Sequence, residues 1–216
     1  MTRQSILNQT ISYAKCIEHW WIFIQDELAD WSLSGGAAYR SDKQEIEQQG
    51  ASMAELIHDK IKRSIQAAEG LYYRLILLVG KTGSGKTGVL RKVAEEFGSS
   101  VVNVNLALSG ELLELTVKQR SLRIPGILDQ LVEQMQSPVL LDNLEILFDK
   151  NLRQDPLRLL QSISRKRTVV ASWNGVITSG RLLYAENGHP EYRNYDSVDA
   201  LIVSMDGTST LDSVKE

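Results

Sequence analysis

The sequence has almost no cysteine and no long apolar run, and each shortage excludes a class of protein. Cys16 is the only cysteine of the 216 residues, so no disulfide can form within the chain. No apolar run reaches the roughly 20 residues that a membrane-spanning helix needs. We therefore expect a cytoplasmic protein that does not enter a membrane.

An excess of positive charge is also missing. The 24 Lys and Arg residues are outnumbered by 27 Asp and Glu residues, which gives a formal net charge of −3. Surfaces that bind nucleic acid in bulk are basic, so we expect no general polyanion-binding surface and no element that reads DNA sequence. Lys118, Arg120 and Arg123 form a local basic cluster, and a solvated surface is its favoured interpretation over a nucleic-acid contact.

An apolar run next to a glycine-rich loop is the most informative stretch. Leu75 to Val79 is apolar throughout, as in a strand buried on both faces of a parallel sheet, and a helical pattern follows the loop. Within the loop, Gly80, Gly85, Lys86 and Thr87 fit the phosphate-binding pattern G-x-x-x-x-G-K-[ST]. An accidental match is the alternative, and the strand–loop–helix context argues against it.

This loop is expected to bind ATP and Mg²⁺. Its backbone N–H groups and the dipole of the next helix can surround a triphosphate. Lys86 would reach the β- and γ-phosphates, and the Thr87 hydroxyl would bind Mg²⁺. The expected triphosphate-binding residues are Gly80, Lys81, Thr82, Gly83, Ser84, Gly85, Lys86 and Thr87.

A second short apolar run ends in a carboxylate. Residues 138–142 read PVLLD, the form of a Walker B strand, in which Asp142 would hold Mg²⁺ through water or through Thr87. Many ATPases carry a water-polarising glutamate directly after this aspartate, but Asn143 stands here. Glu145 is the nearest carboxylate that could serve, and a plain surface glutamate is the alternative. Magnesium binding is therefore better supported than hydrolysis.

A polar residue follows the strand expected over residues 168–173. At that position the Asn174 side chain could reach the γ-phosphate and the attacking water, the role called sensor 1 in ATPases of the AAA+ kind. Asn174-Gly175 is also a common turn pair. A catalytic role for Asn174 and a simple turn both stay open.

Periodicity predicts the remaining elements. Helices are expected over 7–31, 53–68, 110–118, 126–135 and 155–164, with a linker over 41–50 and a capping box formed by Ser52 and Glu55. Further strands are expected over 101–106, 181–184 and 200–205. The alternation of Asn103 and Asn105 with apolar residues places the first of these at an edge of the sheet.

Alternating strands and helices predict the fold class. We expect an α/β, three-layer P-loop NTPase domain with a parallel sheet, an AAA+/ASCE-like core without a C-terminal lid, preceded by a helical N-terminal segment. Residues 1–50 would form a helical extension and linker, and residues 51–216 the ATPase-like domain. Met1 and Met53 both stay open as the true start of the protein.

Several segments together resemble BrxF, the P-loop family of type 3 BREX systems, which exclude bacteriophage from bacteria. They read YRLILLVGKTGSGKT, VVNVNLALS, PVLLDNLEILFD, QDPLRLLQSISRKRTVVASWNG and YAENGHPEYRNY, and the resemblance as a whole covers roughly Met53 to Met205. The D-N-L-E-x-L-F, Q-D-P-L-R-L-L and H-P-E-Y-R runs are the most specific. The resemblance implies an ATP-binding component that acts beside other BREX proteins, including a larger ATPase and a DNA methyltransferase. It implies that Gly80 to Thr87 form the triphosphate loop and that Asp142 is the Walker B acid.

An ATPase or ATP-dependent switch in phage defence is the leading hypothesis. Stimulation by a partner or by homo-oligomer formation is expected, because a charge-stabilising arginine often comes from a neighbouring subunit in AAA+ ATPases. Arg181 and Arg193 could supply it. A non-hydrolysing ATP-binding scaffold is the alternative that Asn143 keeps open. A small P-loop kinase is more distant, since no basic lid segment is evident.

Overall fold

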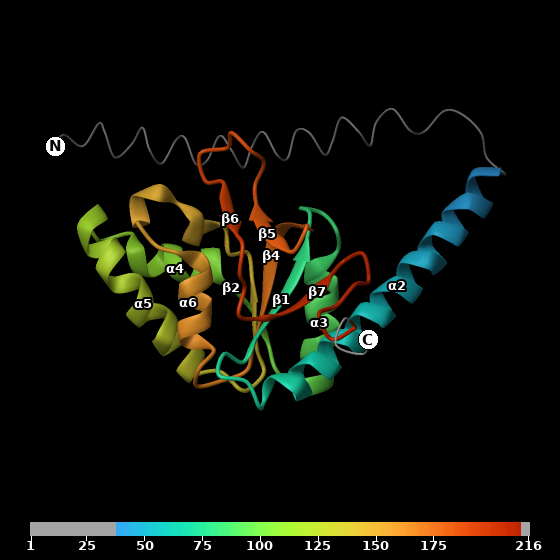
Figure 1. The fold of residues 1–216 in the computed structure, drawn as a ribbon, viewed down its shortest axis with the longest axis horizontal. Helices are drawn as coiled ribbons and strands as arrows, with labels where there is room; N and C mark the ends of the chain where they lie inside the picture. Colours follow the sequence, from blue (N-terminus) through green and yellow to red (C-terminus); the bar gives the residue numbers. More distant parts are fainter. Residues whose placement is uncertain (1–37, 213–216) are drawn as a thin grey trace. The chain divides into compact units, whose positions relative to one another are not determined.

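The computed structural model describes residues 38–212, with side chains from residue 52 onward. The chain divides between Gln49 and Gly50, and the second unit contains the sheet (Figure 1). The helix expected over residues 7–31 lies outside the described part. Within residues 38–212, no helix combines the length and apolar character needed to cross a membrane.

A parallel sheet forms the centre of this unit. Its strand order is β2-β3-β4-β1-β7, and every neighbouring pair along this path is parallel. The strands are β1 (Leu75–Gly80), β2 (Val101–Asn103), β3 (Val139–Asp142), β4 (Val169–Thr178) and β7 (Leu201–Ser204). The predicted edge position of the strand expected over 101–106 is confirmed for its first part, β2, and a strand within 200–205 is confirmed as β7.

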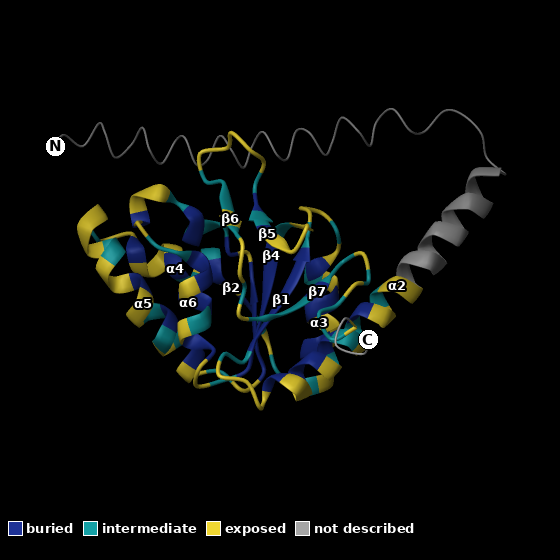
Figure 2. Cartoon of the chain, viewed as in Figure 1, coloured by how far each residue is buried: buried dark blue, intermediate teal, exposed yellow. Residues whose placement is uncertain are grey.

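Helices cover both faces of the sheet (Figure 1). One face packs against α3 (Lys86–Phe97) and against residues 57–68 of α2 (Ala38–Ala68). The other face packs against α4 (Val104–Leu112), α5 (Val117–Glu133) and α6 (Pro156–Ile163). Alternate residues of β1 enter the two cores, because successive strand side chains point to opposite faces. Buried strands between partly exposed helices confirm the predicted three-layer α/β fold (Figure 2).

The strand β4 continues past the point at which β1 ends. Gly80 is paired with Asn174, and the rest of β4 pairs antiparallel with β5 (Arg181–Tyr184), which pairs with β6 (Arg193–Tyr195). The expected end of the strand at Asn174-Gly175 is therefore wrong. A Cβ on Gly175 would lie 1.9 Å from the Leu183 carbonyl oxygen, so the glycine permits the close approach of β5.

The segment after β2 is helical sooner than expected. The predicted strand over 101–106 ends at Asn103, because α4 begins at Val104. The Asn103 side chain caps this helix and accepts a hydrogen bond from the Leu106 N–H at 3.0 Å. The alternation of asparagines was thus a helix-start signal rather than a strand pattern.

Pro125 lies inside α5 and does not separate two helices. The predicted helices over 110–118 and 126–135 are wrong in their boundaries, since α4 ends at Leu112 and α5 continues through the proline. A proline has no N–H, so the carbonyl of Ser121 loses its helical donor. The Gln154 side-chain amide donates to that carbonyl at 2.7 Å and replaces the missing bond.

The helix α2 begins before the expected boundary. It starts at Ala38, so the predicted linker over 41–50 and the capping box at Ser52 are wrong. The predicted apolar stripe is confirmed for its later members, Ile57, Ile61, Ile65 and Ala68, which are buried, whereas Met53 is exposed. The helix expected over 155–164 and the strand over 181–184 are confirmed as α6 and β5.

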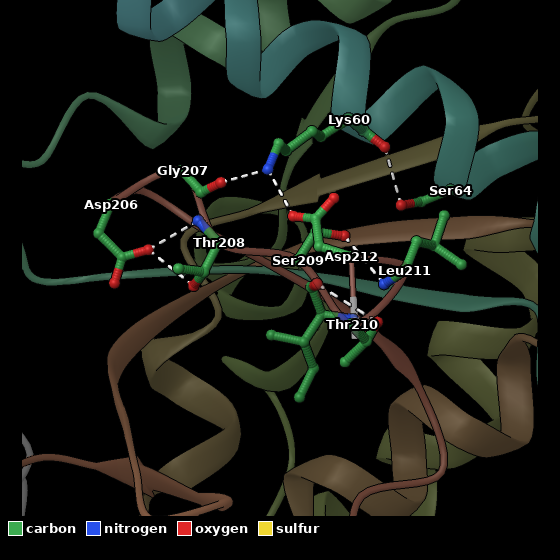
Figure 3. A network of polar contacts seen from close by, with 10 residues as sticks. Lys60, Ser64, Asp206, Gly207, Thr208, Ser209, Thr210, Leu211 and Asp212 are labelled. Carbon is green, nitrogen blue, oxygen red and sulfur yellow. Dashed lines mark hydrogen bonds and ion pairs between the residues drawn. The ribbon is translucent and has the colours of Figure 1, made fainter. Parts of the chain in front are cut away.

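Polar contacts attach α2 to the segment that follows β7. The Lys60 ammonium donates to the Gly207 carbonyl and pairs with the Asp212 carboxylate (Figure 3). On the same helix, His58 Nε2 lies 2.9 Å from a carboxylate oxygen of Glu96 in α3. The part of α2 around His58 and Lys60 is therefore attached to α3 and to the segment after β7.

Candidate functional site

The glycine-rich loop between β1 and α3 has a shape that other residues would not allow. Gly83 and Gly85 have φ values of 77° and 90°, in the left-handed region that favours glycine. A Cβ on Gly80 would lie 2.6 Å from Cγ of Met205, which follows β7. The Met205 N–H also donates to the Val79 carbonyl at 2.8 Å. Met205 therefore packs against the start of the loop and stabilises its position.

Lys86, the first residue of α3, points back into this loop. Its ammonium donates to the carbonyls of Gly80 at 2.8 Å and Lys81 at 2.7 Å. The side chain is almost fully buried, and burial lowers the pKa of Lys86, while the nearby carboxylates of Asp142 and Glu145 oppose this shift. A cation thus lies inside the loop, where a polyphosphate could replace the two carbonyls as its partner.

Asp142 at the end of β3 is held by two hydroxyl groups. Thr87 Oγ1 donates to one carboxylate oxygen, and Ser172 Oγ to the other, each at 2.6 Å. Asp142 is only 6% exposed. Hard oxygen ligands of this kind are the ones that Mg²⁺ prefers, so Thr87 and Asp142 fit the predicted ion. Ser172 was missed, although it is a lone polar residue in the apolar run of β4.

Glu145 accepts hydrogen bonds from two asparagine amides. It begins the 3-10 helix η1 (Glu145–Phe148), and its carboxylate accepts from Asn105 Nδ2 at 2.7 Å and from Asn174 Nδ2. Asn105 also accepts from the Ile146 N–H at 2.8 Å, which fixes the start of η1. Glu145 and Asn174 are therefore in direct contact, as a shared catalytic site requires. Asn105 was missed because it was assigned to a strand.

Asn143 does not take the place of the missing glutamate. Its φ is 55°, in the left-handed region that asparagine tolerates better than most residues, and its side chain is exposed. Its carbonyl accepts from the Asn105 N–H at 3.0 Å. The residue serves the turn that carries the chain from β3 to Glu145.

All of these groups lie at the carboxyl ends of the parallel strands. Because β4 lies between β1 and β3, their parallel carboxyl ends place the phosphate loop, Asn174 and Asp142 side by side. Ligands of α/β proteins with an open sheet bind at the carboxyl ends of the strands. The structure brings the predicted residues together, and the catalytic roles of Glu145 and Asn174 stay predictions.

The two arginines that could project to a neighbouring subunit, Arg181 and Arg193, lie on the β5–β6 hairpin. The Arg181 guanidinium is exposed and lies 2.8 Å from a carboxylate oxygen of Asp196. Arg193 is half-buried and donates to the Tyr192 carbonyl at 3.1 Å. Both guanidinium groups therefore have a partner in this structure.

Comparison with known proteins found a family match for part of the chain. Residues 76–171 match the family described as ATPase family associated with various cellular activities (AAA). The match begins within β1 and ends just before Ser172 and Asn174. No curated protein and no solved structure matches the chain. An AAA-family ATPase domain is thus present in this part of the chain, which includes the loop after β1 and all of β3.

Proposed function

We propose that the protein binds Mg-ATP and hydrolyses it to ADP and phosphate. The observation that carries this proposal is the hydrogen bond between Thr87 of the phosphate loop and Asp142 of β3, at 2.6 Å. It unites the expected triphosphate-binding and metal-binding elements, and Glu145 with Asn174 lies at the same edge. The AAA match over residues 76–171 supports ATP binding and hydrolysis.

Each residue has a defined task in this reaction. The Lys86 ammonium would move from the Gly80 and Lys81 carbonyls to the β- and γ-phosphates. When bound by Thr87 and Asp142, Mg²⁺ would neutralise charge on the phosphate oxygens. Glu145 would accept a proton from the water that attacks the γ-phosphorus, while the bond from that phosphorus to the β–γ bridging oxygen breaks. Asn174 would orient the carboxylate and the water.

Phosphate release separates this function from its alternatives. The protein is incubated with ATP and Mg²⁺ alone, and free phosphate is measured. Release that needs no added acceptor and stops in Glu145→Gln supports an ATPase. Tight ATP binding without release would favour the non-hydrolysing scaffold, and transfer only to an added acceptor would favour a kinase.

We further propose that the protein acts in a BREX bacteriophage-defence system. The support is the resemblance in the segments after β3, at α6 and before β6, which read DNLEILF, QDPLRLL and HPEYR. The partners would be the larger ATPase and the DNA methyltransferase of that system. Affinity purification from cells that carry a complete locus tests this, and phage plating with Lys86→Ala tests whether ATP binding is needed. The proposal is contradicted if the purified protein carries neither partner and the Lys86→Ala variant defends the cells fully against phage.

Turnover would also depend on neighbouring molecules. A charge-stabilising arginine typically speeds phosphoryl transfer by about 10³–10⁵-fold. If it is supplied by a second copy or a partner, the rate per molecule rises with protein concentration or on adding the BREX proteins. The test is phosphate release over a dilution series at fixed ionic strength. A constant rate per molecule in a demonstrated monomer, unaffected by partners, opposes the idea.

A further inference from the structure

A cluster of buried aromatic rings joins the elements that carry Glu145 and Asn174, the candidate catalytic pair. The rings of Phe148 and Tyr184 are nearly parallel, at 7°, with centroids 3.4 Å apart. Trp173 meets both edge-on, at 5.1 Å from Phe148 and 6.1 Å from Tyr184. All three side chains are buried. Packed aromatic contacts of this kind are directional, so they fix the relative position of the elements that carry them.

One end of the stack leads directly to Glu145. Glu145 and Phe148 are the first and last residues of η1. In a 3-10 helix the side chains at i and i+3 lie on the same side. The position of the Phe148 ring therefore determines the rotation of this single turn, and with it the direction of the Glu145 carboxylate.

The other end leads to Asn174. Tyr184 is paired with Gly175, the residue after Asn174, in the antiparallel ladder between β4 and β5. Trp173 directly precedes Asn174 in β4, and its indole N–H donates to the Leu183 carbonyl at 3.0 Å. The strand β5 is therefore fixed to β4 on both sides of Asn174.

We propose that Tyr184 is a positioning residue for ATP hydrolysis, which holds Glu145 and Asn174 in register through its stack on Phe148 and its pairing with Gly175. This inference rests on the proposed ATPase function. Tyr184 is not among the residues expected to contact the nucleotide, so ATP binding by the phosphate loop does not depend on it. The ring is what matters, and the hydroxyl, whose pKa is raised first by burial and then by Glu191 and Glu145, stays neutral.

Replacing the ring tests the idea. Tyr184→Leu is expected to lower kcat by about 10- to 100-fold, because small misplacements of catalytic groups have effects of that size. The ATP dissociation constant stays within about twofold of the wild-type value. Tyr184→Phe keeps the stack and restores turnover. Tyr72→Leu is the matched control, because Tyr72 is exposed and precedes β1. This substitution is expected to leave kcat unchanged.

A double variant distinguishes positioning from general stability. If Tyr184 acts through Glu145, adding Tyr184→Leu to Glu145→Gln lowers the rate no further, whereas an independent effect multiplies. Should Tyr184→Leu not fold, Phe148→Leu breaks the same stack from the other side and is expected to show the same loss of kcat at constant ATP affinity.

Several outcomes overturn the proposal. Full turnover in a folded Tyr184→Leu, parallel loss of ATP binding and kcat, or multiplicative loss in the double variant each contradicts it. A wild-type protein that binds ATP but releases no phosphate would instead defeat the proposed ATPase function, and the positioning role with it. The wild-type measurement therefore tells the two failures apart.

Discussion

Thr87 and Asp142 are joined by a hydrogen bond of 2.6 Å between the threonine hydroxyl and the carboxylate. This bond connects the first turn of α3 with the end of β3, two elements far apart in the sequence. A carboxylate that already accepts from Thr87 and Ser172 has a fixed orientation. The oxygens expected to bind Mg²⁺ are thus placed before the ion arrives.

Asp142→Asn should reduce the magnesium dependence of ATP binding. The amide has no negative charge and offers one acceptor oxygen, so the ion loses its main protein partner. We expect the difference between ATP affinity in Mg²⁺ and in EDTA to shrink by about tenfold or more. Isothermal titration calorimetry in both buffers measures it. Asp199→Asn, at an exposed position, should leave the difference intact.

Lys86→Ala should weaken ATP binding without unfolding the domain. The variant removes the buried cation that is expected to contact the β- and γ-phosphates. A loss of about 10- to 100-fold in affinity is expected for a charged hydrogen-bonding group. Lys92→Ala, an exposed lysine of the same helix, is the control. Equal affinity of a folded Lys86→Ala and the wild type would disprove the assigned site.

Glu145→Gln should separate binding from turnover. Glutamine keeps the size of the side chain but is a poor proton acceptor, so kcat should fall by about 100-fold or more. ATP affinity should change little, because the phosphate loop is untouched. Single-turnover phosphate release and fluorescence binding assays check the two quantities, with exposed Glu114→Gln as control. Unchanged release would move the role of general base to another residue.

Asn143→Glu should not create a better enzyme, although glutamate is usual at that position in related sites. The φ of 55° costs most non-glycine residues about 1 kcal/mol or more. Urea unfolding should show a lower free energy of unfolding for Asn143→Glu, whereas Asn143→Gly should be close to wild type. Faster turnover with undiminished stability would contradict the conformational explanation.

Gln154→Ala should destabilise the domain only while Pro125 is present. The variant leaves the Ser121 carbonyl without a donor, at a cost of about 1 kcal/mol. Pro125→Ala supplies the helical N–H, so the glutamine becomes dispensable in that background. A double-mutant cycle of unfolding free energies measures the coupling. Purely additive effects would show that the amide does not compensate for the proline.

Local chemistry made much of the fold predictable. The apolar run of β1, the phosphate-loop spacing and the carboxylate at Asp142 each depend on neighbouring residues, so the sequence carries them directly. The edge position of β2 was predicted correctly, although Asn105, one of the two asparagines behind that prediction, belongs to α4. The AAA match over residues 76–171 agrees with these predictions.

Long-range contacts explain what could not be predicted. Pro125 stays helical because Gln154, distant in the sequence, donates to Ser121. Asn174-Gly175 could be interpreted as a turn pair from the sequence. The structural reason for the glycine is the close approach of β5, which leaves no room for a side chain and which the sequence does not indicate. The contact of Asn105 with Glu145 joins residues 40 positions apart. No periodic pattern reports such pairs.

The buried position of Trp173 gives the protein an optical probe. The other tryptophans are Trp20, Trp21 and Trp31, near the start of the chain. A variant with phenylalanine at those three positions would emit only from an indole that is fully buried and hydrogen-bonded to Leu183. Loosening of β5 would admit water and shift that emission to longer wavelength. Stopped-flow fluorescence could then follow the hairpin during a single turnover, with no dye attached.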